Sequence, residues 1–356
     1  MLLASLLLFG GQPGFKAWML GPFTREERVN PVLKPNPAAT FRNPVTGKSV
    51  AWEHDNVFNP AEVIKDGRLC LLFRAEDSSG TGIGAHTSRV GYADSADGLH
   101  FVVRSTPVLF PAKDAQKEYD WPGGCEDPRV VRGPNGYVMT YTSWDKKTAR
   151  LSVATSPDLL HWRKRGPAFA KVRGGKWVNL WSKSGSIVTR RRGDGLEATK
   201  IAGNYWMYFG DLNVSLATST NLVDWAPVTD AGGAIKPVLS PRPGRFDSAL
   251  CEGGPPAVLT QHGIVLLYNG SNAVANGDPE LATGVYSAGQ ALFKADHPDQ
   301  LQDRTDAPFL RPERPYEVTG QYRSGTVFIE GLAWFHRHWV LAYGAADSMV
   351  ALARTK

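Results

Sequence analysis

The stretch Gly123-Gly124-Cys125-Glu126-Asp127-Pro128-Arg129 carries the residue types that acid–base chemistry requires. Its two glycines allow the backbone to turn tightly and to approach another group closely. Two carboxylates follow, and Pro128 favours an extended conformation at Asp127. A carboxylate presented beside the cation of Arg129 can act as a general acid. The same residues would also suit an acidic turn closed by an Asp–Arg pair, so the rest of the chain has to decide between the two interpretations.

Other polar residues stand beside glycines or at the ends of apolar runs. Glu252 precedes Gly253 and Gly254, and Glu330 follows the apolar residues 327–329. Charged side chains in such settings are costly to bury unless they are paired or used. The same kind of position is occupied by Asp55, Asn56, Asn59, Arg74, Lys183 and Asp347.

Hydrolysis of a glycosidic bond requires two carboxyl groups, one on each side of the bond that is cleaved. Asp127 has candidate partners for this chemistry in Glu252 and Glu330. The sequence has no Ser-His-Asp arrangement, no glycine-rich phosphate loop and no cluster with metal-ligand spacing. No cofactor or metal is therefore expected.

Short apolar runs rich in aromatic and branched residues are predicted to be the strands that position these side chains. Gly, Asn, Asp and Pro separate them, and no long amphipathic helix is indicated. Residues 1–50 contain many prolines and are expected to form loops that wrap the domain. The clearest predicted strands are residues 69–73, 137–141, 205–209, 264–268 and 339–343.

An internal repeat accompanies these strands. Residues 89–101, 150–162 and 214–225 each read as a strand, a turn containing Ser and Asp or Asn, and an aromatic residue; weaker copies begin at Gly284 and Met349. The period is roughly 60–70 residues. Five such units of about four strands each predict an all-β fold, a five-bladed β-propeller. Polar residues from different repeats would then meet at one central opening, whereas a pair of β-sandwiches would not explain so long a repeat.

The composition argues against nucleic acid as a partner. The chain of 356 residues has a net charge of +6, but its basic residues are scattered. The one dense run, residues 190–192, is followed by Gly193-Asp194-Gly195 and is predicted to be an exposed loop tip. The three cysteines Cys70, Cys125 and Cys251 are expected to be free, partly buried thiols.

The first ten residues, MLLASLLLFG, resemble the apolar centre of a signal peptide, but they lack a basic start and a clear cleavage site. We expect residues 1–20 to be a signal-like or wrapping segment and residues 21–356 to be a single catalytic domain. The expected location is periplasmic or secreted if this stretch is a signal remnant, and cytoplasmic otherwise. No segment is apolar for about 18 residues, so no membrane partner is expected. The oligomeric state is left open.

These motifs together resemble glycoside hydrolase family 130, which contains β-mannoside phosphorylases and β-mannosidases with a five-bladed propeller fold. The resemblance covers nearly the whole chain. The matching segments are Pro22-Phe23, Asn30-Pro31-Val32-Leu33, Asn59-Pro60-Ala61, Leu72-Phe73-Arg74-Ala75, Cys125-Glu126-Asp127-Pro128-Arg129, Gly254-Pro255-Pro256, Pro312-Glu313, Tyr316-Glu317 and Gly344-Ala345-Ala346-Asp347.

The resemblance implies that Asp127 is the catalytic acid; in the phosphorylases of this family, the proton passes through a hydroxyl of the substrate. It also implies that Asp55, Arg74 and Asp347 hold the terminal mannose. Family phosphorylases have His where this chain has Asn269, a small residue in place of Glu252 and no glutamate at the position of Glu330. Added carboxylates would repel a phosphate dianion and could instead activate water.

The sequence therefore predicts an inverting exo-β-mannosidase that cleaves β-1,2-linked mannose from oligosaccharides, with Asp127 as acid and Glu252 as base. Glu330 is the alternative or assisting base. The predicted substrate contacts are Asp55, Asn56, Arg74, Arg129, Arg150, Lys183, Asn269 and Asp347. Three alternatives remain open: a β-mannoside phosphorylase that releases mannose 1-phosphate, since Arg150 and Lys183 are retained; a non-catalytic propeller that binds glycans or proteins; and, more remotely, an arabinan-active enzyme.

Overall fold

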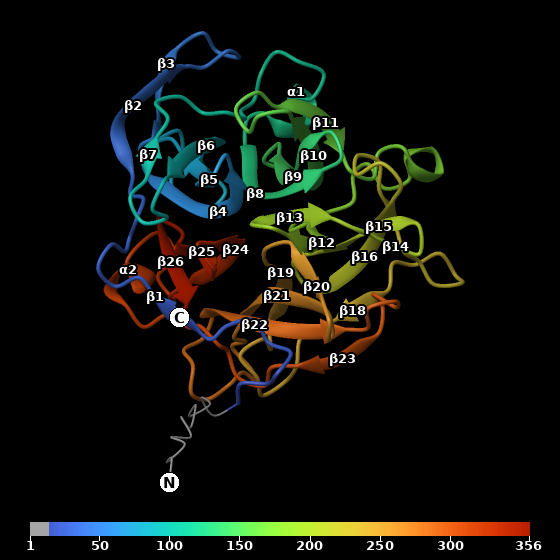
Figure 1. The fold of residues 1–356 in the computed structure, drawn as a ribbon. Coiled ribbons are helices and arrows are strands. Elements are labelled where there is room, and N and C mark those ends of the chain that lie inside the picture. The colour runs from blue at the N-terminus through green and yellow to red at the C-terminus, as the bar shows by residue number, and fades with distance from the viewer. Residues whose placement is uncertain (1–13) are drawn as a thin grey trace.

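The computed structural model describes residues 14–356 (Figure 1), so the predicted signal-like residues 1–10 lie outside the described part. The helices in this part are short: α1 (Lys117–Asp120), α2 (Pro315–Val318) and a 3-10 segment at Val172–Gly175. None of the described helices has the length and apolar character needed to cross a membrane. The prediction of a nearly all-β chain is confirmed.

The strands form consecutive antiparallel groups. The first group contains β4 (Asn56–Lys65), β5 (Arg68–Glu76), β6 (Ser88–Ser95) and β7 (Val102–Val103). The second contains β8 (Gly124–Gly133), β9 (Gly136–Trp144), β10 (Ala149–Ser156) and β11 (Arg163–Pro167). In both groups the strands pair in sequence order, as expected where neighbouring strands are joined by short turns.

The third and fourth groups follow the same order with interruptions. The third contains β12 (Ser186–Arg192), β13 (Gly195–Ala198), β14 (Lys200–Ile201), β15 (Asn204–Phe209), β16 (Val214–Ser219), β17 (Ala226–Pro227) and β18 (Pro237–Leu239). The fourth contains β19 (Leu250–Gly253), β20 (Ala257–Thr260), β21 (Gly263–Ser271), β22 (Tyr286–Phe293) and β23 (Leu301–Arg304).

The fifth group joins the two ends of the described chain. It contains β24 (Val327–Phe335), β25 (His338–Ala345), β26 (Met349–Thr355) and the N-terminal strand β1 (Phe23–Arg25). β1 pairs antiparallel with β26, and Phe23 lies opposite Thr355. Figure 1 shows β1 beside the C-terminus.

Each group contacts the next, and the fifth contacts the first (Figure 1). β6 meets β8 at Ser88 and Gly124, and β12 pairs in parallel with β20. The Val57 amide of β4 donates to the Ser348 carbonyl at 3.2 Å and so joins the fifth group to the first. The first strands β4, β8 and β24 therefore lie close to one another although they are far apart in the sequence.

The predicted strands and repeats occupy equivalent places in these groups. Residues 69–73, 137–141, 205–209, 264–268 and 339–343 lie within β5, β9, β15, β21 and β25. The strong repeat copies cover β6, β10 and β16 with the turn that follows each strand. In each turn a serine hydroxyl accepts a backbone N–H three residues later, at 2.9 Å for Ser95, Ser156 and Ser219. The predicted side-chain closure of these turns is confirmed.

The hydrophobic core is divided into clusters that lie between neighbouring groups. One cluster brings Leu71 and Phe73 of β5 together with Ala342 of β25 and Leu352 of β26. Residues on both faces of the central strands are buried, so the strands read as continuous apolar runs. Cys70, Cys125 and Cys251 are buried and unpaired, in agreement with the prediction of free thiols.

The expectation that residues 1–50 form only loops is wrong for part of this region. β2 (Asn36–Arg42) and β3 (Ser49–Glu53) form an antiparallel hairpin. Prolines within and before β2 led us to expect a loop there instead of a strand. The strand forms nevertheless, because proline is tolerated on strands at the edge of a sheet. Within the described part of the N-terminal segment, Trp18 packs into the core and its indole N–H donates to Asp303 at 2.8 Å.

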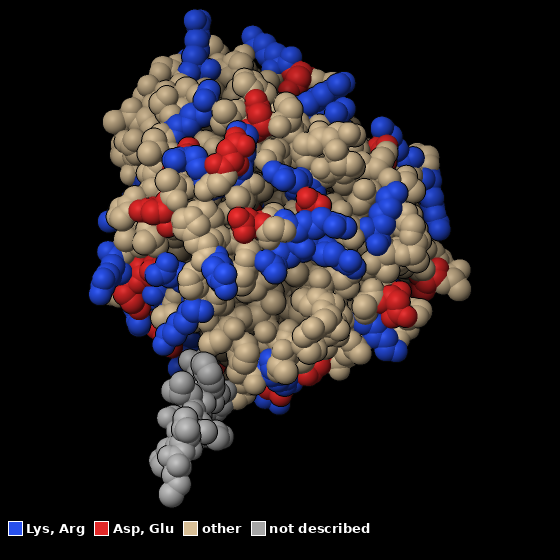
Figure 2. All heavy atoms as spheres, viewed as in Figure 1, with Lys and Arg blue, Asp and Glu red and all other residues tan. Residues whose placement is uncertain are grey.

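Lysine and arginine side chains are spread over the face seen in Figure 2, with acidic side chains between them. The run at residues 190–192 lies at the exposed end of β12, just before the turn into β13. The predicted exposed tip is thus confirmed.

We expect Arg25→Ala to lower the free energy of unfolding by about 3–5 kcal/mol, because it leaves a buried carboxylate without its cation. Arg25 of β1 bonds Glu317 at 2.7 and 3.0 Å, and the Glu317 side chain is fully buried. Urea denaturation measures the change. Arg354→Ala is the matched control, because Arg354 pairs with Glu26 at a more exposed site and should cost about 1 kcal/mol or less. Equal losses in the two variants would contradict the role assigned to the Arg25–Glu317 pair.

Candidate active site

The Asp127 carboxylate is the centre of a cluster that joins the first two strand groups. Its Oδ1 accepts a hydrogen bond from Asn59 Nδ2 at 3.0 Å and one from Arg74 Nη1 at 3.1 Å. Arg74 also contacts Glu76 at 2.6 Å and Glu126 at 3.0 Å. One buried guanidinium therefore holds three carboxylates from two groups.

Local backbone geometry aims these side chains. Asn59 and Asp127 have φ values of 47° and 49°, and each precedes a proline in a strand with a register shift. Asn and Asp tolerate positive φ better than most residues. A bulge of this kind redirects a side chain out of the regular alternation of a strand. Asn59-Pro60 and Asp127-Pro128 are thus equivalent devices on neighbouring strands.

Arg129 ties the second group to the fourth and fifth. Its guanidinium donates to the carbonyls of Gly253 and Gly254 at 2.7 and 2.8 Å and contacts Glu330 at 3.0 Å. It also donates to the Asp127 carbonyl at 3.1 Å. Because these contacts occupy a side chain that is only 2% exposed, Arg129 positions the site rather than offering a free cation to a substrate.

The Glu252 carboxylate comes directly before the Gly253 and Gly254 carbonyls that Arg129 bonds. Ser184 donates a short hydrogen bond to it, and Lys183 lies close enough to influence its ionisation. Burial raises the pKa of Glu252 to about 7, although the positive charge of Lys183 opposes the rise. Burial lowers the pKa of Lys183, but the carboxylates of Glu126, Asp127 and Glu252 outweigh burial and raise it. Lys183 therefore stays charged among them.

Asp127 has the opposite balance. Burial alone would raise its pKa, but the charges of Arg74 and Lys183 and the hydrogen bond from Asn59 outweigh burial and lower the pKa to about 2. Asp127 is thus ionised at neutral pH in the ligand-free protein. The environments of the two candidate carboxyls separate their pKa values, and in the ligand-free protein Glu252 holds a proton more readily than Asp127.

Glu330 lies deeper than Glu252. It is fully buried, and Arg129 is its charged neighbour. Burial raises the pKa of Glu330 well above its usual range, and the charge of Arg129 opposes the rise. In this position Glu330 supports Arg129 and does not face solvent.

The predicted mannose contacts lie around the same centre. Burial raises the pKa of Asp347 to about 7, while Arg74 acts in the opposite direction. The Asn56 amide donates to Glu76 at 2.9 Å and accepts from Ser348 at 2.8 Å. Asp55 is the more exposed member and contacts His54 at 2.5 Å and His86 at 3.4 Å.

Two predicted substrate contacts are engaged elsewhere. Both polar atoms of the buried Asn269 bond the backbone of Ile329, at 2.8 and 3.1 Å, so its amide is not free for a sugar. Arg150 bonds Asp145 at 2.9 Å and Asn179 at 2.9 and 3.1 Å. The described contacts of Arg150 do not include the carboxylates around Asp127.

Sequence reasoning missed several members of the cluster. Glu76, Glu126 and Ser184 contact the predicted residues, and Gln321 bonds both Glu76 and the Asp347 carbonyl. Glu76 follows Arg74 by two residues on β5, so the period of a strand places both side chains on one face. That spacing was the available signal for Glu76; Gln321 gives none.

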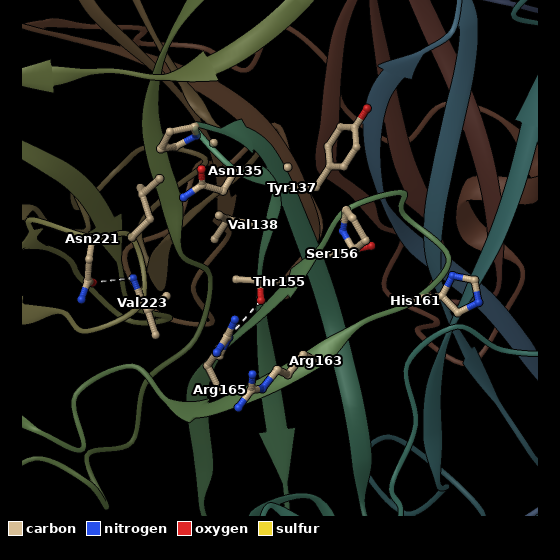
Figure 3. A pocket seen from close by; sticks show the side chains of 15 residues that line it. Asn135, Tyr137, Val138, Thr155, Ser156, His161, Arg163, Arg165, Asn221 and Val223 are labelled. Atoms are coloured by element: carbon tan, nitrogen blue, oxygen red, sulfur yellow. Dashed lines mark hydrogen bonds between the residues drawn. The ribbon is translucent and has the colours of Figure 1, made fainter.

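The hollow drawn in Figure 3 is not part of this cluster. Its volume is about 380 Å³, and it lies between the turns of the second and third groups. Asn135, Thr155, Arg163 and Arg165 are among its lining residues, and no carboxylate lines it. It therefore lacks the pair of carboxyl groups that hydrolysis of a glycosidic bond requires. Within residues 14–356, no set of three or more His, Cys, Asp or Glu side chains is placed to hold a metal ion.

Comparison with known proteins places this site in a family. The sequence profile of a family described as β-1,4-mannooligosaccharide phosphorylase, glycoside hydrolase family 130, matches residues 24–356. A 1,2-β-oligomannan phosphorylase of Thermoanaerobacter sp. (strain X514) is 28% identical over 307 residues, which are 85% of this chain and 90% of that protein.

Two solved structures are more similar. A glycosyl hydrolase from Bacteroides ovatus superposes with a TM-score of 0.94 at 49% identity, covering 96% of this chain and 95% of that one. A second structure has the same score, identity and coverage. It comes from work stating that the family of mannoside phosphorylases contains glycoside hydrolases that target β-1,2-mannosidic linkages in Candida mannan. The profile match across almost the entire described chain establishes the family, and this protein therefore belongs to glycoside hydrolase family 130.

Proposed function

We propose that the five strand groups are the blades of a five-bladed β-propeller and that residues 21–356 form one catalytic domain. The successive contacts between groups and the pairing of β1 with β26 support this architecture. In such a ring the first strands of the groups surround a common centre, where Asp127 and Glu252 lie.

We further propose that the protein is an inverting exo-β-mannosidase that uses water to cleave β-1,2-linked mannose. Asp127 is the acid and Glu252 the base. Since Asp127 is ionised before substrate binds, it must gain a proton as the sugar enters. Mannose hydroxyls that accept hydrogen bonds from Arg74 and Lys183 would weaken the interaction of these two cations with Asp127. The pKa of Asp127 would then rise.

The observation that carries the hydrolytic proposal is the Glu252 carboxylate beside Lys183. A base that takes a proton from water works best with a pKa near the working pH, and that of Glu252 is about 7. When ionised, Glu252 repels an incoming phosphate dianion and neutralises the cation that would attract it. The 49% identity to a protein described as a glycosyl hydrolase also supports hydrolysis.

A β-mannoside phosphorylase is the second candidate, for two reasons. The curated relatives, including the one that is 28% identical, are named as phosphorylases. In addition, Lys183 stays charged at this site and offers an ammonium group to an anionic nucleophile. The choice between water and phosphate therefore requires a direct test.

We expect the protein to release mannose from β-1,2-mannobiose in phosphate-free buffer and to form no mannose 1-phosphate when phosphate is added. The ionised Glu252 carboxylate disfavours a phosphate dianion at the site. Chromatography of the products with and without phosphate, on β-1,2- and β-1,4-mannobiose, measures nucleophile and linkage together. Stoichiometric mannose 1-phosphate would establish the phosphorylase instead.

We expect kcat/KM to fall as the pH rises above about 7. An inverting reaction needs one protonated and one ionised carboxyl. In the free protein the pair of Asp127 and Glu252 holds one proton between their pKa values of about 2 and about 7. Above the upper value both groups are ionised and the required proton is lost, whichever residue delivers it. A profile that stays flat from pH 6 to 9 (about two units beyond this value) would contradict the assignment; thermal unfolding at each pH is the control.

A further inference from the structure

Two large apolar side chains remain exposed beside the carboxylate cluster. Trp181 is 51% exposed and Leu212 is 58% exposed. Trp181 precedes Lys183 by two residues, and Leu212 lies in the loop that follows β15. An exposed indole on a fixed segment near a sugar site is a candidate ligand contact, because it offers a large rigid apolar face.

Hydrogen bonds fix the segment that carries Trp181. The Ser182 amide donates to the Ala149 carbonyl at 3.1 Å, and its hydroxyl accepts from the Leu151 amide at 3.1 Å. The Lys183 carbonyl accepts from the Gly210 amide at 2.9 Å. Ser182 is thus bonded to β10, whereas the charge of the neighbouring Lys183 acts on Glu126, Asp127 and Glu252. Trp181 is bonded to Asp211, whose charge acts on Glu252, so the Trp181 ring lies near the carboxylates.

The orientation of the Trp181 ring is also set. Its indole N–H donates to Asp211 Oδ2 at 2.8 Å. The ring meets that of Trp144 edge-on, with centroids 5.9 Å apart and an interplanar angle of 76°. Trp144 is itself anchored by a 3.0 Å hydrogen bond to the Gly84 carbonyl. A ring held at its edge with half its surface exposed is prepared to bind a flat partner without further ordering.

The loop that holds Asp211 and Leu212 connects this ring to Glu252. Its Gly210 amide bonds Lys183, and its Leu212 carbonyl accepts from the Cys251 amide at 3.1 Å. Burial is the main cause of the raised pKa of Glu252, and the charge of Asp211 adds to it. The loop therefore runs from Lys183 to the residue before Glu252, and Trp181 lies at the outer rim of the carboxylate cluster.

We propose that Trp181, oriented by Asp211 and flanked by Leu212, is the platform for the second sugar of the substrate, the one released with the leaving group. A pyranose ring has an apolar face of C–H groups that can stack on an indole, while its hydroxyls can bond the Asp211 carboxylate. The terminal mannose binds among the more buried Arg74 and Asp127, so the rest of the chain leads outward past Glu252 to Trp181. This inference rests on the proposed action on β-mannosides and holds for water or phosphate as nucleophile.

The test is calorimetric binding of mannose and of β-1,2-mannobiose to protein carrying Asp127→Asn, which slows turnover. Adding Trp181→Ala should raise the Kd for mannobiose about tenfold and leave the Kd for mannose unchanged within about twofold. Trp181→Phe keeps an aromatic face but loses the bond to Asp211, and should fall between the two. Trp334→Ala is the matched control, because Trp334 lies at the hairpin end of β24 against Arg191.

The outcomes separate the two proposals. Selective loss of mannobiose affinity with an unchanged Tm supports the platform. Equal losses for both sugars, or no loss for either, overturn it and leave the proposed function in place. Failure of both sugars to bind before Trp181 is changed overturns the platform together with the proposed function.

Discussion

Replacing Asp127 by Asn should reduce turnover of β-1,2-mannobiose by about 10²- to 10⁴-fold, the usual contribution of a general acid. The amide keeps the shape of the carboxyl but cannot deliver its proton. Asn also tolerates the positive φ of 49° at this position, so the bulge in β8 should survive. Steady-state kinetics measures the loss, and sugar binding should persist in calorimetry.

Asp66→Asn is the matched control for this change. Asp66 also has a positive φ, 51°, but its side chain is 79% exposed in the turn between β4 and β5. Its replacement should leave kcat and KM unchanged. Near-normal turnover by the Asp127 variant would mean that another carboxyl supplies the proton, and the buried Glu126 beside Arg74 would be the next residue to test.

Replacing Glu252 by Gln should reduce turnover of β-1,2-mannobiose by a similar factor, about 10²- to 10⁴-fold, because an amide cannot accept the proton of the attacking water. The amide can still accept the hydrogen bond from Ser184, so the local geometry should be retained. Glu197→Gln is the control, since Glu197 pairs with Arg192 on an exposed hairpin. Wild-type activity in the Glu252 variant would mean that another group acts as the base.

A substrate with an acidic phenol as leaving group separates the two roles. Such a group departs without protonation, so the Asp127 variant should lose much less activity on it than on mannobiose. The Glu252 variant should lose activity on both substrates, because water still requires a base. The reverse pattern would exchange the two assignments. The comparison is needed because the low pKa of Asp127 keeps this carboxyl ionised in the ligand-free protein.

Much of the local structure could be predicted from the sequence. Apolar runs such as residues 69–73 and 137–141 became central strands because their side chains are buried on both faces. The repeated turn was predictable because Ser95 and Asp97 bond backbone groups within three residues of themselves. Each of these features depends on interactions within one repeat, so one repeat suffices to specify it.

The residue types at the site could also be predicted, because these charged residues stand next to glycine and proline in the sequence. The side chains of Asp127 and Glu252 could be named because carboxylates in such places are costly unless used. The β2–β3 hairpin could not be predicted in the same way, because its prolines mimic a loop.

The sequence by itself thus determined the central strands, the repeat and the chemical types of the site residues. Only the tertiary structure decided that Arg129 and Asn269 bond backbone from other groups, that Arg150 is engaged by Asn179, and that Glu330 lies deeper than Glu252. The physical reason is twofold. Bulges in β4, β8 and β24 break the alternation from which a side chain's direction is read. The charge state of each carboxyl depends on burial and on cations from other repeats, such as Arg74 beside Asp127, which no local spacing reveals.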